Sequence, residues 1–383
     1  MAKRREKGDG SIYQRESDKM WVAYVRVPET TKKKYVYDKT RSGAAKKLKE
    51  LQRSIDQGTL VTAKAETVEA YLRYWLEIHS AKIKETTRIT YRTQINVCTP
   101  HIGAITLTKL TGAHMQKMYA KLAEKQKSSS VHMLHTVLKV AFKDAIRWKR
   151  LARNPCDDID APALQHEERP FLNADQCKIL LKAAEGTDVE CFLAMALTTG
   201  MRRGEMLGLR WADIDMEQKY LSVQRTASYI NSATTGGKYS VVETSTKTKA
   251  SKRSIRLTDF LILVLKVHKK KQNEIRLQAG QEWAGKDLVF CGNQGKHFSV
   301  MTITAHYKKL LQENDLPPLH IHDLRHSAAT LLASMGIPAK VIQEILGHSS
   351  VTITQNLYGH VIDGMQEEAM QKMDDFFQKN GTK

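Results

Sequence analysis

Apolar positions divide the chain into a β-rich beginning and a long helical remainder. Residues 21–27 and 35–37 are rich in β-branched and aromatic side chains and predict two strands, and residues 10–13 predict a short first strand. A helical pattern begins at Ser42 and ends near Gly58. Residues 1–60 are therefore expected to form a small α+β domain, a three-stranded sheet with one helix.

A second, all-α domain is predicted over residues 65–160, after a short linker. Apolar side chains recur with helical spacing from Thr67 onward. Three more helices are expected over residues 86–98, 111–122 and 131–148, with a turn at residues 100–103.

The third domain is predicted over residues 171–383. Three prolines interrupt the helical pattern between residues 155 and 170, which marks a boundary. Asn173 then starts a mainly helical pattern as the expected N-cap of its first helix. The strands expected in this domain lie near residues 220–223, 239–243, 254–257 and 288–290.

The net charge of +20 indicates a polyanionic partner. Residues 1–60 carry 16 Lys and Arg against 8 Asp and Glu, and residues 65–160 carry 16 against 9. Residues 161–383 are nearly balanced, with 28 against 24. Attraction to an anion is thus concentrated in the first two domains. Arg26 and the lysines at 32–34 are candidates for phosphate contacts, although such a lysine run is otherwise a solvated turn.

Cysteine usage and hydropathy favour a cytoplasmic protein. The five cysteines are scattered and form no CxxC pair, so neither a disulfide framework nor a thiolate metal site is expected. No apolar run approaches membrane-spanning length, and the basic start at Lys3 lacks the apolar region of a signal peptide.

Two arginines are candidates for binding one phosphate. Arg202 follows a turn at Gly200, and Glu205 lies one helical turn later, where it can hold the Arg202 guanidinium. Taken alone, such an Arg-x-x-Glu pair is usually a surface ion pair. His322 and Arg325 are three residues apart and would share one face of a helix. Two guanidinium forks would stabilise the charge that develops on a pentacoordinate phosphorus.

Tyr358 is the candidate nucleophile for attack on that phosphate; the alternative is a core tyrosine. A phenol has a pKa of about 10, and nearby arginines would favour its ionised form. His322 is suited to relay the proton, and His348 to donate a hydrogen bond to a phosphate oxygen. The leaving 5′-hydroxyl needs a general acid. Lys247, expected in a hairpin between strands, is the candidate, with Lys249 as its rival.

A zinc site is a competing interpretation of the histidines. His322 and His326 have the i, i+4 spacing of two ligands on a helix. The glutamate of a His-Glu-x-x-His hydrolase is missing, however, and Asp323 stands in its place. The sequence therefore favours chemistry without a metal.

The order Arg, Lys, His-x-x-Arg, His, Tyr resembles the tyrosine recombinase (phage integrase) family. The matching words are Thr-Gly-Met-Arg-Arg-Gly-Glu, Thr-Lys-Thr-Lys, His-Asp-Leu-Arg-His, Leu-Gly-His-Ser-Ser and Asn-Leu-Tyr-Gly-His. Tyr358 falls ten residues after His348, as in many integrases of the family. The chain departs from the family pattern at Arg203 and Arg256, where an apolar residue and a proline are more usual.

The resemblance implies a fold and a role for each site residue. Residues 171–383 would be a mainly helical catalytic domain with a small antiparallel sheet, residues 65–160 a SAM-like core-binding domain, and residues 1–60 an arm-type DNA-binding domain. The implied phosphate-activating residues are Arg202, His322, Arg325 and His348, with Lys247 as general acid, Tyr358 as nucleophile and Glu205 as a supporting acid.

The implied activity is site-specific recombination of double-stranded DNA. Strands would be cut and rejoined through a 3′-phosphotyrosine and a Holliday junction, with no cofactor, to integrate and excise a phage or a conjugative transposon. A homotetramer on core and arm sites is implied, with an excisionase and a host DNA-bending protein as candidate partners. Residues 361–377 are amphipathic and are expected to pack on a neighbouring protomer.

Two alternatives remain open at this point. A type IB topoisomerase-like enzyme would use the same attack by tyrosine without exchanging partner strands, but the additional basic sheet domain favours recombination between two sites. A non-catalytic DNA-binding regulator would retain its function without Tyr358.

Overall fold

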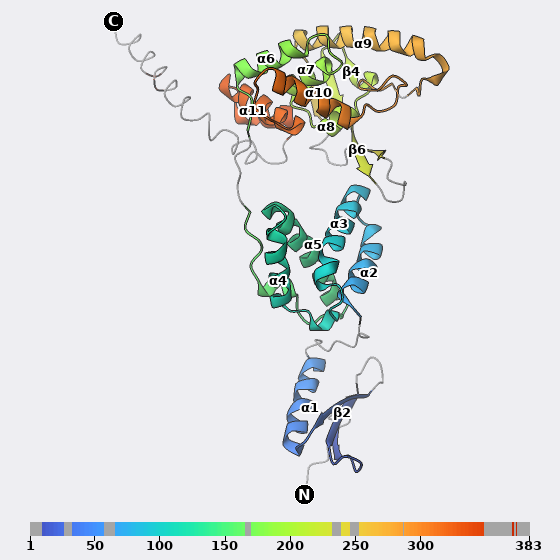
Figure 1. Cartoon of the computed structure of the whole chain (residues 1–383), viewed down its shortest axis with the longest axis vertical. Helices are drawn as coiled ribbons and strands as arrows, with labels where there is room; N and C mark the ends of the chain where they lie inside the picture. The colour runs from blue at the N-terminus through green and yellow to red at the C-terminus, as the bar shows by residue number, and fades with distance from the viewer. Residues whose placement is uncertain are drawn as a thin grey trace. The chain divides into compact units, whose positions relative to one another are not determined.

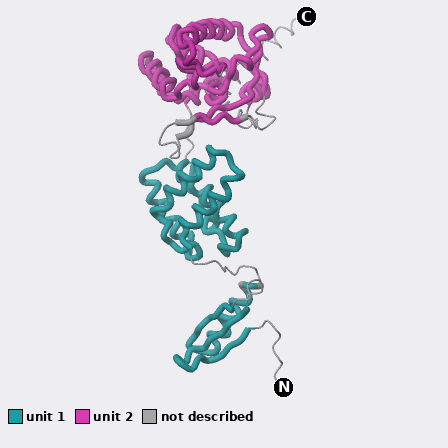
Figure 2. The backbone as a smooth tube through the Cα atoms, turned by 90° about the vertical axis from the view of Figure 1, so that its right-hand side faces the viewer, with its two compact units in different colours: residues 1–166 teal, residues 167–383 magenta. Residues whose placement is uncertain are grey.

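Sheet and helical parts follow one another along the chain in the order that the hydrophobic pattern predicts (Figure 1). The computed structural model describes residues 10–26, 33–56, 66–164, 170–231, 239–245, 253–285 and 287–347, together with Met370 and Met373. Residues 1–166 and 167–383 are two separate units, each with its own core (Figure 2). No helix within the described ranges is both long and apolar enough to cross a membrane.

The first unit begins with the predicted three-stranded sheet. Strands β1 (Ser11–Gln14), β2 (Trp21–Arg26) and β3 (Lys33–Asp38) are antiparallel in the order β1-β2-β3. Helix α1 (Arg41–Asp56) covers one face, where Ala23 and Val25 of β2 pack against Ala44 and Leu48. The predicted turn at residues 28–31 and the linker at 61–64 lie outside the described residues.

Four helices follow in the first unit, as predicted. They are α2 (Val68–Ser80), α3 (Glu85–Ile102), α4 (Gly112–Ala123) and α5 (Ser128–Arg147). Their core contains the fully buried Trp75, whose Nε1 donates to the Asp144 carboxylate at 2.8 Å. The turn predicted at residues 100–103 begins only at Gly103, because α3 continues to Ile102. Proline removes one helical N–H there, close to the helix end, while the buried side chains of Cys98 and Ile102 keep the last turn packed.

The second unit is mainly helical. Its helices are α6 (Ala174–Ala184), α7 (Glu190–Thr199), α8 (Arg203–Leu207), α9 (Asp259–Ala279), α10 (Val300–Glu313), α11 (Leu324–Ser334) and α12 (Ala339–Leu346). Helix α7 is buried along most of its length and contributes Phe192 and Leu193 to the core. Asn173 caps α6 as predicted, since its side chain accepts from the Gln176 N–H at 2.9 Å.

Two small antiparallel sheets complete the second unit. Strand β5 (Tyr220–Val223) lies between β4 (Ile214–Asp215) and β8 (Arg253–Arg256), and β6 (Arg225–Asn231) pairs with β7 (Tyr239–Ser245). Only Gln224 separates β5 from β6. The strand predicted at residues 288–290 is reduced to one isolated bridge between Arg210 and Leu288.

The predicted Lys247 hairpin lies outside the described residues, and the described parts of the flanking strands β7 and β8 pair with other strands. Ser245 at the end of β7 pairs with Arg225, and Arg253 at the start of β8 pairs with Val223. Both strands therefore use the consecutive β5 and β6 as partners instead of each other. Two residues of strand span about 7 Å, so Ser245 and Arg253, which flank residues 246–252, are held close together.

Candidate active site

The turn between α7 and α8 positions Arg202. Gly200 ends α7 with a φ of +58°, and a Cβ there would lie 2.1 Å from Cδ2 of Leu346, so only glycine fits. Arg202 is the N-cap of α8, and its Nη1 donates to Oε1 of Glu205 at 2.9 Å. Its Nη2 donates to the Gly347 carbonyl at 3.1 Å. The Arg202 side chain remains 40 % exposed, so its outer edge faces solvent.

Arg325 is a buried arginine near the beginning of α11. Its Nη1 donates to the Gly200 carbonyl at 2.7 Å, which ties α11 to the turn that carries Arg202. Its Nη2 is buried and has no hydrogen-bond partner among the described residues. Burial, and after it the nearby positive charge of Arg202, lower the pKa of Arg325 to about 9. An anion beside both arginines would stabilise the charged form of Arg325.

Glu205 is the carboxylate that neutralises part of this charge. It is 3 % exposed. Burial on its own would raise the pKa of Glu205, but hydrogen bonds and charges from Arg253 and Arg202 outweigh burial and leave that pKa below its ordinary value. The backbone N–H of Arg202 also donates to Oε2 at 3.0 Å. The contact predicted from the Arg-x-x-Glu spacing is thus present, in a buried setting.

Arg253 belongs to the same cluster and is not singled out by the sequence motifs. Its Nη2 and Nη1 donate to Glu205 Oε2 and Oε1 at 2.8 and 3.1 Å, and its Nε donates to the Ile345 carbonyl at 2.9 Å. The available signal was strand alternation, since Arg253 shares the inward face of β8 with the buried Ile255.

His322 and Arg325 lie on consecutive elements instead of one helix. His322 is exposed in the 3₁₀ turn Ile321–Asp323, and α11 begins at Leu324. The Asp323 carboxylate accepts from the His320 N–H at 2.8 Å and closes this turn before the α-helix starts. The rings of His322 and His326 meet edge to face, with centroids 6.0 Å apart.

The remaining predicted site residues, Lys247, Lys249, His348 and Tyr358, lie outside the described residues. The structure therefore brings together Arg202, Glu205 and Arg325, with Arg253 added. In the described part of the chain, no three His, Cys, Asp or Glu side chains are grouped so that they could hold a metal ion.

Two family models match this chain. The model of the phage integrase family matches residues 170–364, and that of the phage integrase N-terminal SAM-like domain matches residues 67–123. The chain belongs to the phage integrase family and is a tyrosine-type site-specific recombinase. These matches do not favour the topoisomerase-like alternative.

Individual relatives include a tyrosine recombinase and several integrases. A "Tyrosine recombinase XerC-like" protein of Caldanaerobacter subterraneus is 31 % identical over 90 % of this chain and 92 % of its own length. The ICEBs1 integrase of Bacillus subtilis is 30 % identical over 72 % of each chain.

Solved structures share the fold. The Tn1549 transposon integrase in complex with transposon right end DNA has a TM-score of 0.68 at 19 % identity, covering 80 % of this chain and 99 % of that one. A lambda integrase tetramer bound to a Holliday junction has a TM-score of 0.56 at 20 % identity, covering 92 % and 96 %. The predicted three-part fold is thus confirmed.

Proposed function

We propose that this chain is the integrase of a phage or conjugative element and that Tyr358 attacks the scissile DNA phosphate. One observation carries the proposal. Arg325 holds a buried guanidinium beside a second guanidinium, and its Nη2 has no hydrogen-bond partner in the part of the chain that the structure describes. The one carboxylate of Glu205 does not neutralise both charges. A phosphate diester supplies the missing negative charge and the acceptor oxygens that these forks fit.

The reaction assigns one task to each predicted residue. Arg202 and Arg325 bind the non-bridging oxygens and stabilise the charge that builds on phosphorus. The Tyr358 oxygen forms a bond to phosphorus while the bond to the 5′-oxygen breaks. His322 accepts or relays the phenolic proton, and His348 donates a hydrogen bond to a phosphate oxygen.

The leaving 5′-oxygen takes a proton from Lys247, with Lys249 as the alternative donor. Support for a lysine in this segment comes from the register of β7 and β8, which holds the flanking Ser245 and Arg253 next to β6 and β5. Helix α8, which Arg202 caps, packs on β6. The products are a 3′-phosphotyrosyl strand and a free 5′-hydroxyl. Because the ester retains the bond energy, a second strand can reverse the step without ATP or a metal.

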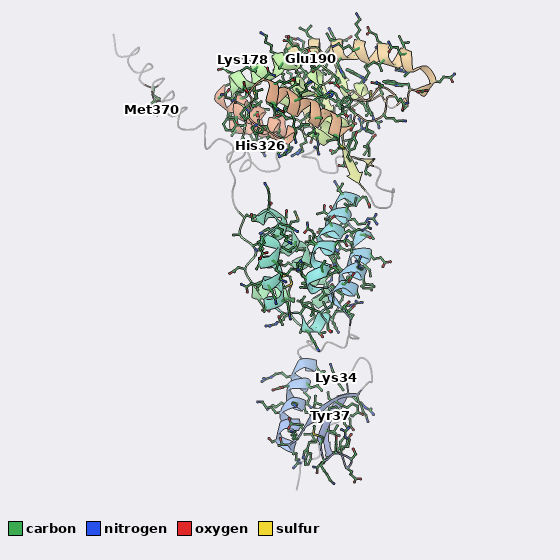
Figure 3. The ribbon with its side chains drawn as sticks, in the orientation of Figure 1. Lys34, Tyr37, Lys178, Glu190, His326 and Met370 are labelled. Carbon is green, nitrogen blue, oxygen red and sulfur yellow. The ribbon has the colours of Figure 1, made fainter. Side chains whose placement is uncertain are left out.

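DNA is the proposed partner of all three predicted domains. The face of the first sheet opposite α1 carries Tyr13, Tyr24, Tyr35 and Tyr37, of which three are more than 40 % exposed. Basic groups lie over these rings, with Lys33 Nζ 4.5 Å from the Tyr24 centroid and Arg15 5.5 Å from that of Tyr37. Figure 3 labels Tyr37 and Lys34 on β3. A basic, aromatic sheet face suits an arm-type DNA site.

The proposed assembly is a homotetramer on DNA, because two sequential strand exchanges through a four-way junction need four active sites. The domain roles follow the predicted ranges, with residues 1–60 on arm sites, 65–160 on the core site and 171–383 in catalysis. Residues 361–377 are proposed to pack on a neighbouring protomer, and removing 361–383 should prevent assembly on DNA. An excisionase and a host DNA-bending protein are further proposed partners in the bacterial cytoplasm.

The direct test is covalent capture of DNA. The chain is incubated with fragments that flank its encoding gene, and adducts are resolved on denaturing gels. We expect a wild-type adduct that Tyr358→Phe abolishes while binding persists. A supercoiled plasmid without an attachment site distinguishes a recombinase from a topoisomerase-like enzyme, since efficient relaxation of this plasmid would identify the latter.

A further inference from the structure

We propose that Arg253 is a positioning residue for strand cleavage. It holds the Arg202 guanidinium in place through its contacts with Glu205 and with the end of α12. This inference rests on the proposed function, because it concerns the same phosphate-binding arginines. The Arg253 side chain is 7 % exposed, so its guanidinium does not present itself to DNA. Its effect must pass through the groups it touches.

Arg253 uses its donors on two separate elements. Nη1 and Nη2 form a two-point contact with the Glu205 carboxylate of α8, at 3.1 and 2.8 Å. Nε donates to the carbonyl of Ile345 in α12 at 2.9 Å. A Cβ added to Gly347 would lie 2.9 Å from Cδ of Arg253, so the α12 end rests directly on this side chain.

The Glu205 carboxylate accepts four hydrogen bonds. Arg202 supplies two, from Nη1 at 2.9 Å and from its backbone N–H at 3.0 Å, and Arg253 supplies the other two. Without Arg253, the Glu205 carboxylate would retain partners on the Arg202 side alone. It could then rotate toward Arg202 and take over donors that should point at a phosphate.

The end of α12 is held in a similar way. Its last carbonyls carry the partial negative charge of a helix C-terminus. Arg253 binds the Ile345 carbonyl, and Arg202 Nη2 binds the Gly347 carbonyl at 3.1 Å. The next residue in the sequence is the predicted His348. Release of this end would displace Arg202, and a misplacement of about 1 Å is enough to slow a reaction by about 100-fold.

A different role is conceivable from the position of Arg253 alone. It also begins β8, where segment 246–252 with Lys247 ends. If Arg253 acted by placing the general acid, its loss would matter only while the leaving oxygen needs a proton. The contacts of Arg253 with Glu205 and α12 favour a role in positioning the phosphate-binding arginines instead. Substrates that differ in the scissile group distinguish these two roles.

The test compares Arg253→Met and Arg253→Lys with Arg256→Met in the full-length chain. Arg256 is a matched control, because it lies in the same strand but is exposed over the Tyr220 ring. The substrates are nicked duplexes of the core site, located by adduct mapping. The scissile group is a phosphodiester, a neutral methylphosphonate, or a phosphorothiolate with sulfur at the 5′-bridging position. Single-turnover adduct formation, DNA affinity and melting temperature are measured.

We expect Arg253→Met to reduce adduct formation on the phosphodiester by about 100-fold, with DNA affinity nearly unchanged. The loss should shrink to about 10-fold or less on the methylphosphonate, because a neutral group depends less on the arginines. The phosphorothiolate should not restore the rate, although thiolate needs no general acid to leave. Arg253→Lys keeps the positive charge but not the planar guanidinium. Its rate of adduct formation should lie between those of wild type and Arg253→Met. Arg256→Met should match wild type.

Three results would overturn the proposal. These are equal losses on phosphodiester and methylphosphonate, full rescue by the phosphorothiolate, or wild-type rates in either Arg253 variant. If Arg253→Met does not fold, the proposal is tested by the same comparison of adduct-formation rates among the three substrates, measured with Arg253→Lys. Failure of the proposed function looks different, because wild-type protein would then form no adduct on any substrate.

Discussion

Glu205 determines how much positive charge remains for a ligand at the site. It is buried against Arg253 and Arg202, and its carboxylate is shared between them. Arg325 stands apart from this pairing, with its Nη1 on the Gly200 carbonyl. Three guanidinium groups and one carboxylate leave a surplus of positive charge, which suits a phosphate diester more than a neutral ligand.

Glu205→Gln should destabilise the chain in a pH-dependent way. The pKa of Glu205 is lowered from its ordinary value of 4.5, so its stabilisation is fully present above that pH and is lost as pH falls through the lowered pKa. We expect a difference in unfolding free energy of about 3 kcal/mol at pH 7, as for a broken buried pair.

Urea denaturation followed by tryptophan fluorescence at several pH values checks this. The difference between wild type and Glu205→Gln should shrink below pH 4.5. Glu185→Gln, at an exposed position, is the control and should change little. A difference that stays constant, or grows as pH falls, would contradict the assignment of Glu205 as an ionised partner of both arginines.

Local spacing was enough to predict part of the site. Arg202 and Glu205 are three residues apart, and a helical turn places them in contact whatever surrounds them. Arg253 was missed because its partner lies 48 residues earlier in the sequence, and no local pattern reports such a contact. The roles of Lys247, His348 and Tyr358 remain predictions from the motif.

At the scale of elements, α8 connects the arginine turn to the sheets. A Cβ on Gly204 would lie 2.7 Å from Thr226 Cγ2 and 2.9 Å from the Ala227 carbonyl of β6. The helix can approach the strand this closely because it has no side chain there. The position of Arg202, its N-cap, therefore depends on the β6–β7 pair.

Gly204→Ala should lower the melting temperature of the second unit and slow adduct formation. The added methyl meets backbone, which cannot move freely, and overpacking of this kind costs about 1–3 kcal/mol. In a helix without such a contact, alanine would be more stable than glycine by about 1 kcal/mol. A lower melting temperature would therefore show that the close approach to β6 outweighs helix propensity. Gly292→Ala is the control, because the nearest atom to its Cβ would be 4.0 Å away. A stabilised Gly204→Ala protein would show that the close approach is absent.

Sequence patterning found most elements but not all of their partners. Strands β5 and β8 have alternating buried positions and were predicted, whereas β6 reads Arg-Thr-Ala-Ser-Tyr-Ile-Asn and has no dense run of apolar residues. It is a strand because β7 pairs with it along its length. For the same reason the sequence did not predict that the described parts of β7 and β8 pair with β6 and β5.

At the scale of the whole chain, charge and chemistry lie in different parts. Most of the excess of Lys and Arg lies in the first 160 residues, and the arginine cluster lies in the last 217. The order of a sheet domain, a helical domain and a mixed domain was predictable from periodicity alone. The exact domain limits and their DNA partners remain predictions, because hydrophobic pattern does not encode docking geometry.

Removal of residues 1–60 should separate two DNA activities. The sheet domain has its own small core, so the rest of the chain should fold without it. We expect much weaker binding to arm-site DNA, while adduct formation on a nicked core site stays near the full-length rate. Gel-shift and adduct assays on the two DNAs measure this. Undiminished arm binding by the truncated chain would refute the assignment of that domain.

The most direct measurement is the identification of the residue that becomes bonded to DNA. A nicked core-site duplex traps the cleaved product, and mass spectrometry of the digested adduct locates the attachment. The account predicts a 3′-phosphate on the Tyr358 oxygen, a free 5′-hydroxyl on the released strand, and no adduct with Tyr358→Phe. DNA attached to another residue, or an undiminished adduct in Tyr358→Phe, would contradict it.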